Sequence, residues 1–223
     1  MNPENSMPMA IEGLATADVV DALVRTFDHR SHIDGLVGPS NNGTIVGPAV
    51  TVGFLPVRRD LMDPHRHSLG PAIYNAVADR DATGAVLVMA SNGNPGISLG
   101  GSTKLSRVKN LNLAGVVCDG LLRDFDELEE YPFSAYCTGE AVRGGGNLIQ
   151  PYLANVPVRL DEVTVVPGDT VFADPTGVAI IPAGHEEEIF TLAQKIKKMG
   201  HDMLGMIADE DPATVIRDGS KEA

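Results

Sequence analysis

The chain has 223 residues, of which 43% are hydrophobic and 21% charged, a composition typical of a globular protein with one sizeable core. A formal net charge of −13 and an aromatic content of 4% argue against a nucleic-acid partner, which requires clustered Lys and Arg and stacking rings. No apolar run approaches the roughly 20 residues that cross a bilayer, and residues 1–13 lack the basic and apolar regions of a secretory signal. With only two cysteines, Cys118 and Cys137, we expect a reduced, cytoplasmic protein without membrane association.

The first half of the chain alternates helical and strand patterns. Residues 16–27 have the apolar spacing of an amphipathic helix, with Thr16 as candidate N-cap. Residues 44–56 read as a strand pair, or as one long strand kinked at Pro48. A probable helix, 70–82, is followed by the wholly apolar strand 84–91.

A βαβ unit comes next in the chain. The strand 84–91 leads through a glycine loop into a helix over 102–113 and then into a second apolar strand over 114–120. This order, with a period of roughly 30 residues, predicts two parallel strands joined by a crossover helix.

The second half is rich in strands and turns. Strand patterns occupy residues 132–137, 156–160, 163–174 and 177–182, with corner turns at "PGD" and "DPTG". A helix over 185–207 begins with acids and carries its lysines later, which suits the helix dipole. Asp211 and Pro212 then begin a short tail helix. We expect one α/β domain over residues 1–205 and a polar tail over 206–223 that packs on a neighbouring subunit.

The segment Gly100–Lys104 is the first candidate for a binding site. Two glycines before a helix let the backbone approach a ligand, and the first amides of a helix have no partner within it. The positive end of the helix dipole favours a carboxylate or phosphate there. The alternative is an ordinary strand-to-helix turn in which Ser102 is the N-cap.

Arg123 and Asp124 are the second candidate. They follow an apolar strand at its carboxyl end, where open α/β sheets place their ligand crevices. The planar Arg guanidinium can donate two parallel hydrogen bonds to a carboxylate or enolate. One Asp carboxylate, together with water and substrate oxygens, is enough to bind Mg²⁺ or Mn²⁺. The alternative is an exposed ion pair at the start of a helix. Two consecutive βα units would place this pair and the glycine turn on the same edge of a parallel sheet.

Several of these stretches together resemble a known family. The chain is similar to the RraA-like family, which includes the regulator of ribonuclease activity A and the 4-hydroxy-4-methyl-2-oxoglutarate and 4-carboxy-4-hydroxy-2-oxoadipate aldolases. The resemblance spans roughly residues 15–182 and is carried by "TADVVDAL", "GPAVTV", "LGGS", "AGVVCDGLLRD" and "VPGDTVFADPTGVAIIP". It implies a single-domain α/β sandwich of the swivelling, phosphohistidine-domain-like type. It also implies a homotrimer or a dimer of trimers with active sites at subunit interfaces.

The resemblance also implies a chemistry. The loop amides matching Gly101, Ser102, Thr103 and Lys104 would hold the carboxylate of a 2-oxo acid. Arg123 would bind the pyruvyl oxygens, and Asp124 would be the ligand of Mg²⁺ or Mn²⁺. The metal would stabilise an enolate while a carbon–carbon bond breaks. The implied enzyme is therefore a metal-dependent lyase that performs retro-aldol cleavage or decarboxylation and releases pyruvate.

This sequence departs from the aldolase pattern. The aldolases carry an acid at the position of Ser102, and Lys198 falls near a tail glutamate that the family brings from the neighbouring subunit. Lys104 occupies a loop position that is often apolar, and we expect its side chain to lie on the surface. The departures leave two alternatives: a diverged enolate enzyme such as a tautomerase or hydratase, or a non-catalytic protein that docks on a partner as the ribonuclease regulators do.

Four further features are weaker candidates for functional residues. His65 and His67 stand two apart and lack a visible third metal ligand. Asp119 is expected to fix the turn before Arg123, and Cys118 to fill the core. The stretch "VRGGGN" over 142–147 matches no phosphate-loop spacing and is interpreted as a flexible turn.

Overall fold

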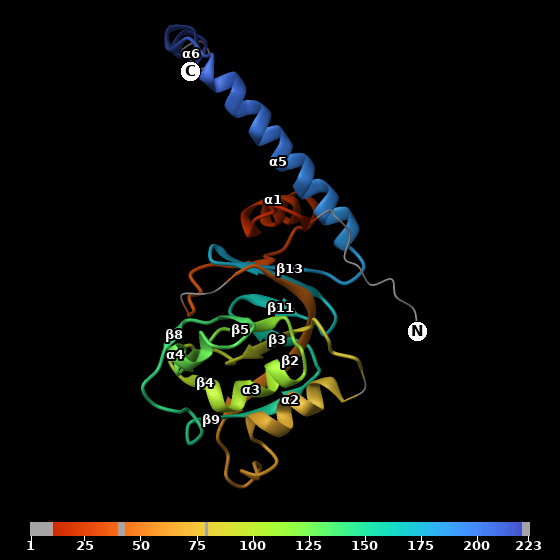
Figure 1. Cartoon of the computed structure of the whole chain (residues 1–223), viewed down its shortest axis with the longest axis vertical. Coiled ribbons are helices and arrows are strands. Elements are labelled where there is room, and N and C mark those ends of the chain that lie inside the picture. Colours follow the sequence, from red (N-terminus) through yellow and green to blue (C-terminus); the bar gives the residue numbers. More distant parts are fainter. Residues whose placement is uncertain (1–10, 40–42, 79, 220–223) are drawn as a thin grey trace.

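The computed structural model describes residues 11–39, 43–78 and 80–219. An eight-stranded mixed sheet forms the centre, in the order β1-β13-β12-β2-β3-β5-β7, with β9 also paired to β2 (Figure 1). Its strands are β1 (His32–Ile33), β2 (Ile45–Pro56), β3 (Val86–Ala90), β5 (Gly115–Cys118), β7 (Ser134–Tyr136), β9 (Ile149–Ala154), β12 (Thr170–Asp174) and β13 (Gly177–Ile181).

Two smaller sheets and six helices complete the described part of the chain. One sheet is the parallel set β4 (Ser98–Gly101), β6 (Leu121–Arg123) and β8 (Gly139–Glu140), and the other is the hairpin β10 (Val158–Leu160) and β11 (Val163–Val165). The helices are α1 (Thr16–Thr26), α2 (Leu69–Val77), α3 (Ser102–Asn110), α4 (Phe125–Leu128), α5 (Glu186–Ala208) and α6 (Pro212–Gly219).

Strand β2 is one long strand and not a pair. Its first part, up to Pro48, is antiparallel to β12, while the part from Ala49 onward runs parallel to β3 and antiparallel to β9. Gly47 is required here, because a Cβ atom would lie 2.0 Å from the carbonyl oxygen of Gly84. One strand therefore joins the antiparallel and the parallel halves of the sheet.

The parallel strands set up the site. Strands β3, β5 and β7 are adjacent and parallel, and each continues along the chain into one strand of the small parallel sheet, β4, β6 and β8 respectively. The predicted βαβ unit is thus confirmed, with β4 inserted between β3 and α3. Helices α2 and α3 pack on this half through an apolar cluster that includes Ile73, Leu87, Leu105 and Val116.

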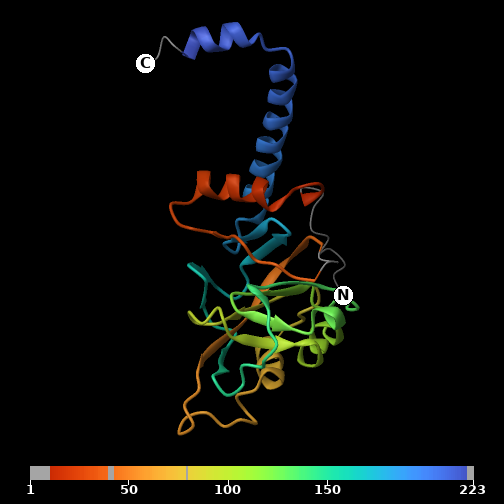
Figure 2. The same cartoon turned by 90° about the vertical axis from the view of Figure 1, so that its left-hand side faces the viewer.

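A helical layer covers the other end of the sheet. Helix α1 and the first half of α5 pack on β12 and β13 through Leu23, Phe172 and Phe190. The second half of α5 runs away from the body, and α6 follows at its far end (Figures 1 and 2). Among the helices of residues 11–39, 43–78 and 80–219, none combines the length and the apolar character that a membrane span requires.

The helix starts differ from the predictions in one respect. The N-cap of α1 is Ala15 and not Thr16. Thr16 is the first helical residue, and its N–H donates to Asp174 Oδ2 at 2.7 Å, so a distant carboxylate takes the place of a local cap. The tail helix does begin as predicted, since the Asp211 carboxylate accepts from the Ala213 N–H at 3.0 Å and the Thr214 hydroxyl at 3.2 Å.

Candidate active site

The two candidate segments meet because β4 and β6 are neighbours. Gly101, the last residue of β4, is the register partner of Arg123, the last residue of β6. Helix α3 starts immediately after Gly101. Asp124 follows Arg123 in the left-handed conformation, with φ 65° and ψ 51°, which turns the chain from β6 into α4. The start of α3 and the Arg–Asp pair therefore lie side by side at one sheet edge.

The Asp124 carboxylate is held by the residues around it. Its Oδ2 atom accepts from the Ser102 N–H at 3.2 Å, and its Oδ1 atom lies 3.5 Å from Arg123 Nη2. A Cβ atom on Gly101 would lie 2.6 Å from Asp124 Oδ2. Glycine at 101 is therefore needed for the carboxylate to reach the start of α3.

Ser102 is a link between two acids and not the N-cap of α3. The cap position belongs to Gly101, and Ser102 is 1% exposed. Its Oγ atom lies 3.2 Å from Asp124 Oδ2 and hydrogen-bonds the carboxylate of Glu127, in α4. A hydroxyl has one proton and can satisfy only one of these carboxylates. An acid side chain thus does lie at the start of α3, but α4 supplies it, and sequence spacing alone did not reveal Glu127.

A cavity of about 320 Å³ opens beside this pair. Among the predicted site residues, Gly101, Thr103, Lys104, Arg123 and Asp124 line it. Ser102 lies behind the cavity wall, and its amide is engaged by Asp124. Arg123 is 41% exposed and Asp124 30% exposed at the side chain, so both are accessible to a ligand.

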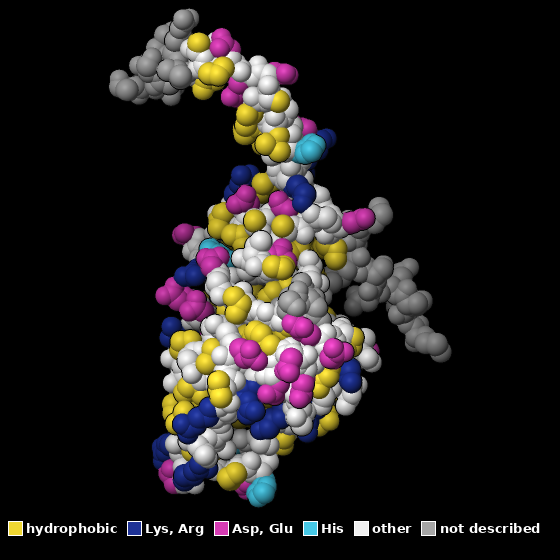
Figure 3. Space-filling view, turned by 60° about the vertical axis from the view of Figure 1, so that its left-hand side comes forward, with side chains coloured by type: hydrophobic (Ala, Val, Ile, Leu, Met, Phe, Trp, Pro, Cys, Tyr) yellow, Lys and Arg dark blue, Asp and Glu magenta, His cyan; other side chains and the backbone are white. Residues whose placement is uncertain are grey.

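The lining of the cavity is cationic in an acidic chain. Lys104 and Arg123 line it together with His67, and Asp124 is the only acid among the lining residues. The net charge of the whole chain is −13. Figure 3 shows Lys and Arg side chains gathered on the lower part of the body, below a group of Asp and Glu. Such a lining favours an anionic ligand.

The glycine run after β8 belongs to this cavity. Gly144, Gly145 and Gly146 line it, so "VRGGGN" is part of the site wall and not only a turn. A Cβ on Gly144 would lie 3.3 Å from Arg123 Nη1, and one on Gly145 would lie 2.2 Å from the Ser98 carbonyl oxygen. A Cβ atom at 145 would clash with the Ser98 backbone, so glycine is required there, a constraint that the interpretation as a flexible turn did not anticipate.

Of the two candidate histidines, His67 lies at the cavity and His65 does not. His67 lines the cavity and stacks on Tyr152, with ring centroids 5.1 Å apart. His65 is exposed, and its N–H donates to Asp63 Oδ1 at 2.7 Å. Over residues 11–39, 43–78 and 80–219, no group of three or more His, Cys, Asp or Glu side chains is arranged to hold a metal ion. A metal at Asp124 would therefore rely on water and ligand oxygens for its other positions.

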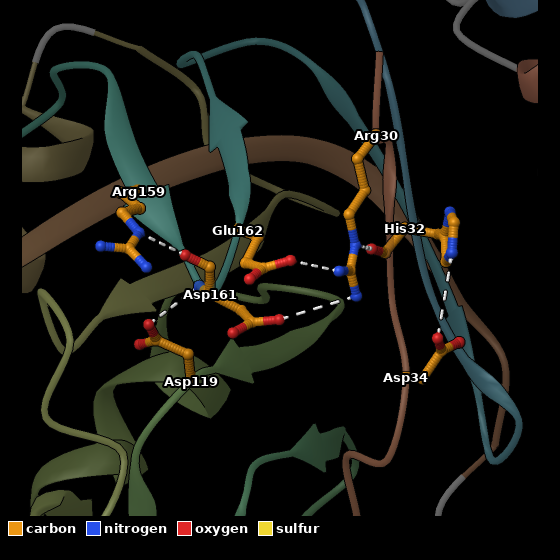
Figure 4. A network of polar contacts seen from close by, with 7 residues as sticks. All are labelled: Arg30, His32, Asp34, Asp119, Arg159, Asp161 and Glu162. Carbon is orange, nitrogen blue, oxygen red and sulfur yellow. Dashed lines mark hydrogen bonds and ion pairs between the residues drawn. The ribbon is translucent and has the colours of Figure 1, made fainter.

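Asp119 stabilises a different part of the molecule. It is 5% exposed and accepts from the N–H groups of Ser91 and Asp161, which ties the end of β3 to the β10–β11 hairpin. Arg30 reaches the same hairpin through Asp161 and Glu162 (Figure 4). Asp119 is not among the cavity-lining residues, so its part in the structure is the hairpin contact.

Lys198 lies on α5, at the opposite end of the molecule from β4 and β9 (Figure 1). Within one chain it is therefore far from the cavity. Cys118 and Cys137 are buried free thiols; Cys118 is the last residue of β5, and Cys137 directly follows the neighbouring strand β7. Burial raises the pKa of the Cys118 thiol, as expected for a residue that fills the core.

Comparison with known proteins identifies the family. The RraA-like family (Aldolase/RraA) matches residues 16–180. The chain belongs to the RraA-like family. A Halalkalibacterium halodurans protein named "Putative 4-hydroxy-4-methyl-2-oxoglutarate aldolase" is 29% identical over 188 residues, which cover 82% of this chain and 79% of that protein. Protein DlpA of Legionella pneumophila is also 29% identical, over 193 residues, but this chain spans only 29% of its length.

A solved structure confirms the fold of this RraA-like chain. The Streptomyces coelicolor protein RraAS2, described as an unusual member of the RNase ES inhibitor RraA family, superposes with a TM-score of 0.75 at 24% identity. The match covers 91% of this chain and 98% of that one. The predicted α/β fold of the RraA type is therefore confirmed. The relatives' names include both an aldolase and an RNase inhibitor, so function has to be argued from the site.

Proposed function

We propose that this RraA-like protein is a divalent-metal-dependent lyase that acts on a 2-oxo acid through an enolate. The observation that carries the proposal is the register pairing of Gly101 with Arg123, which places the first turn of α3, the guanidinium and the Asp124 carboxylate beside one cationic cavity. The name of the Halalkalibacterium halodurans relative supports the same class of reaction.

Each group suits one part of a 2-oxo acid. The free N–H groups of Thr103 and Lys104, in the first turn of α3, suit the carboxylate. The Arg123 fork suits the keto oxygen and the adjacent carboxylate oxygen, and it would stabilise the negative charge that develops there. Phe54, Leu69 and Ile149 form apolar wall beside these groups and limit water around the reacting carbons.

The metal requirement fits the donor set. Asp124 presents a hard carboxylate to the cavity, and Mg²⁺ or Mn²⁺ is commonly held by one or two carboxylates plus water and substrate oxygens. A divalent cation there would supply Lewis-acid polarisation of the keto group. The Ser102 N–H fixes one oxygen of this carboxylate, so its orientation is set before a ligand arrives.

Retro-aldol cleavage and decarboxylation both proceed without an oxidant or a reductant. In retro-aldol cleavage, the C4 hydroxyl loses its proton, the C3–C4 bond breaks, and its electron pair forms the enolate of pyruvate. In decarboxylation, the same bond breaks with release of CO₂. In both, C3 then takes a proton. Arg123 serves both reactions because both develop charge on the same oxygen.

The test compares pyruvate release from 4-hydroxy-4-methyl-2-oxoglutarate and from oxaloacetate, with Mg²⁺, with Mn²⁺ and with a chelator. Arg123→Ala should lower kcat/KM by about 100-fold or more, as expected for loss of a group that stabilises developing charge. Arg143→Ala is the matched control, because Arg143 is exposed and does not line the cavity. No turnover by the folded wild type would support the regulator alternative instead.

The oligomer is part of the proposal. We propose that the chain forms a homotrimer or a dimer of trimers, because the projecting half of α5 carries exposed apolar side chains that a second copy would cover. They are Met199, Met203, Leu204, Met206 and Ile207. Light scattering should give a trimer or hexamer mass, and the double variant Met203→Asp, Leu204→Asp should lower it. A monomeric wild type at micromolar concentration would contradict this.

We also place the protein in the cytoplasm, which its two free thiols support.

A further inference from the structure

The Ser102 hydroxyl lies between the carboxylates of Asp124 and Glu127. Its Oγ atom is 3.2 Å from Asp124 Oδ2 and makes a closer hydrogen bond to Glu127 Oε2. An O–H···O bond usually spans about 2.5–3.0 Å, so the contact with Asp124 is a long one. Ionised carboxylates have only acceptor atoms, and a hydroxyl has one proton to donate. These distances assign the Ser102 proton to Glu127.

The surroundings of Ser102 leave its hydroxyl few other partners. The residue is 1% exposed, and within the described residues its Oγ atom donates to no acceptor besides these two carboxylates. A buried hydroxyl without an acceptor costs free energy, so the proton turns to Asp124 whenever Glu127 cannot take it. The main-chain N–H of Ser102 already donates to Asp124 Oδ2 at 3.2 Å. Loss of Glu127 would therefore give that oxygen a second donor.

Negative charge is scarce in the cavity that Asp124 lines. Asp124 is the only acid among the described residues of the lining, and Lys104 and Arg123 bring two positive charges to it. A hydrogen bond donated to a carboxylate spreads its negative charge and competes with a cation for it. Hard divalent cations prefer charged oxygen ligands. A second donor on Asp124 Oδ2 would therefore weaken the binding of a divalent cation.

We propose that Glu127 is a positioning residue that acts on Asp124 through Ser102: it accepts the Ser102 proton and so keeps the Asp124 carboxylate free for a divalent cation. The inference rests on the proposed function, because it requires that Asp124 binds the metal. Glu127 lies on α4, which begins directly after Asp124, so one short segment supplies both the ligand and the residue that controls it. Glu127 does not line the cavity, so it is not a metal ligand itself.

The test measures the affinity for Mn²⁺ by electron paramagnetic resonance, which needs no turnover. Glu127→Met keeps the length of the side chain and removes the acceptor, and the dissociation constant for Mn²⁺ should rise by about tenfold. Glu127→Gln keeps a carbonyl acceptor for the hydroxyl and should stay within about threefold of wild type. Glu130→Met is the matched control, because it removes an exposed acid just after α4 that makes no described hydrogen bond to Ser102. It should bind Mn²⁺ as wild type does.

A double variant separates this route from a general loss of charge or structure. When Glu127→Met is combined with Ser102→Ala, the competing hydroxyl is gone and the main-chain N–H of residue 102 remains. The affinity for Mn²⁺ should then return to within about threefold of wild type. A loss that persists in the double variant would overturn the inference, because Glu127 would then act through charge or packing. An equal loss in Glu127→Gln and Glu127→Met, or unchanged affinity in Glu127→Met, would overturn it as well.

The same titrations distinguish this inference from the lyase proposal. Wild type that binds Mn²⁺ with the expected dependence on Glu127 but releases no pyruvate would overturn the lyase proposal alone. Wild type that releases pyruvate while Glu127→Met binds Mn²⁺ normally would overturn the role of Glu127 alone. Wild type that binds no Mn²⁺ would overturn the metal requirement and the role of Glu127 together.

Discussion

The Ser102 amide donates to the Asp124 carboxylate at 3.2 Å, across 22 residues of sequence. This contact joins the first turn of α3 to the residue that follows β6. It uses one of the free amides of the helix for a protein carboxylate and leaves the amides of Thr103 and Lys104 for a ligand. The same contact holds one oxygen of the carboxylate, so the geometry of residues 101 and 102 controls the orientation of Asp124.

Gly101→Ala should displace the Asp124 carboxylate. The new Cβ atom would lie 2.6 Å from Asp124 Oδ2 and 3.3 Å from Arg123 Cβ, so the carboxylate has to move from the Ser102 amide. We expect metal-dependent turnover to fall by about tenfold and stability by about 1 kcal/mol. Gly96→Ala is the control, since Gly96 does not line the cavity and nothing lies within 4 Å of a Cβ atom there. Equal kinetics in the two variants would show that Asp124 does not depend on Gly101.

Asp124→Asn should weaken the binding of Mn²⁺. The amide is close in shape to the carboxylate but carries no charge, and hard divalent cations prefer charged oxygen ligands. Titration followed by electron paramagnetic resonance should show loss of the site, whereas Asp126→Asn, an exposed residue in α4, should bind as wild type does. Addition of a chelator to wild type should reproduce the activity of Asp124→Asn. Unchanged Mn²⁺ affinity in Asp124→Asn would place the metal elsewhere.

Gly145→Ala should destabilise the fold more than any other change in the glycine run. Its Cβ would lie 2.2 Å from the Ser98 carbonyl oxygen and 2.6 Å from Ile97 Cγ2, and the backbone has to shift to make room. We expect a loss of about 3 kcal/mol in the free energy of unfolding, measured by urea denaturation. Gly146→Ala serves as control, since nothing lies within 4 Å of a Cβ atom there. A loss under about 1 kcal/mol would mean that the segment relaxes freely.

Asp174 should stabilise the protein above acidic pH. Burial raises the pKa of its carboxyl, but hydrogen bonds from Thr176 and from the Thr16 N–H outweigh burial and hold the pKa below the ordinary value of 3.8. Because the pKa is lower in the folded state, the Asp174 carboxylate stabilises the fold at pH values above its unfolded-state pKa. This stability is lost as the pH falls through the folded-state pKa. Asp174→Asn should therefore cost about 2 kcal/mol at neutral pH and flatten the decline below pH 4.

The measurement for Asp174 is thermal unfolding between pH 2 and pH 7. Asp21→Asn is the control, because Asp21 is exposed on α1. If Asp174→Asn and wild type lose stability in parallel as the pH falls, the carboxylate contributes nothing that depends on its charge.

The Tyr136 phenol should ionise at a higher pH than an ordinary tyrosine. Burial, together with the nearby charge of Asp174, raises the pKa of the phenol to about 12, and its hydroxyl donates to the Gly43 carbonyl oxygen at 2.8 Å. A raised folded-state pKa means that its contribution to stability is present below the unfolded value and is lost as pH rises toward 12. Ultraviolet titration of Tyr136→Phe should lack the step of highest pH. Tyr152→Phe, whose tyrosine is partly exposed, should keep that step.

Local patterns in the sequence determined much of this fold. The alternation of apolar strands and helices predicted the βαβ unit, because the unit forms from neighbouring segments whose hydrophobic periods are distinct. The same patterns placed Arg123 and Asp124 after a buried strand, and the motif "AGVVCDGLLRD" indicated the family. The parallel arrangement then required that Gly101 and Arg123 lie at one edge, as the register of β4 and β6 shows.

Contacts between distant segments were decided only by the tertiary structure. Ser102 reads as a cap in sequence, but a carboxylate from α4 and another from the end of β6 take its hydroxyl and amide. Gly145 reads as a flexible turn, yet it packs against the backbone of Ser98. Local propensity sets which segments become strands and helices, whereas burial and hydrogen-bond partners depend on which of those segments meet.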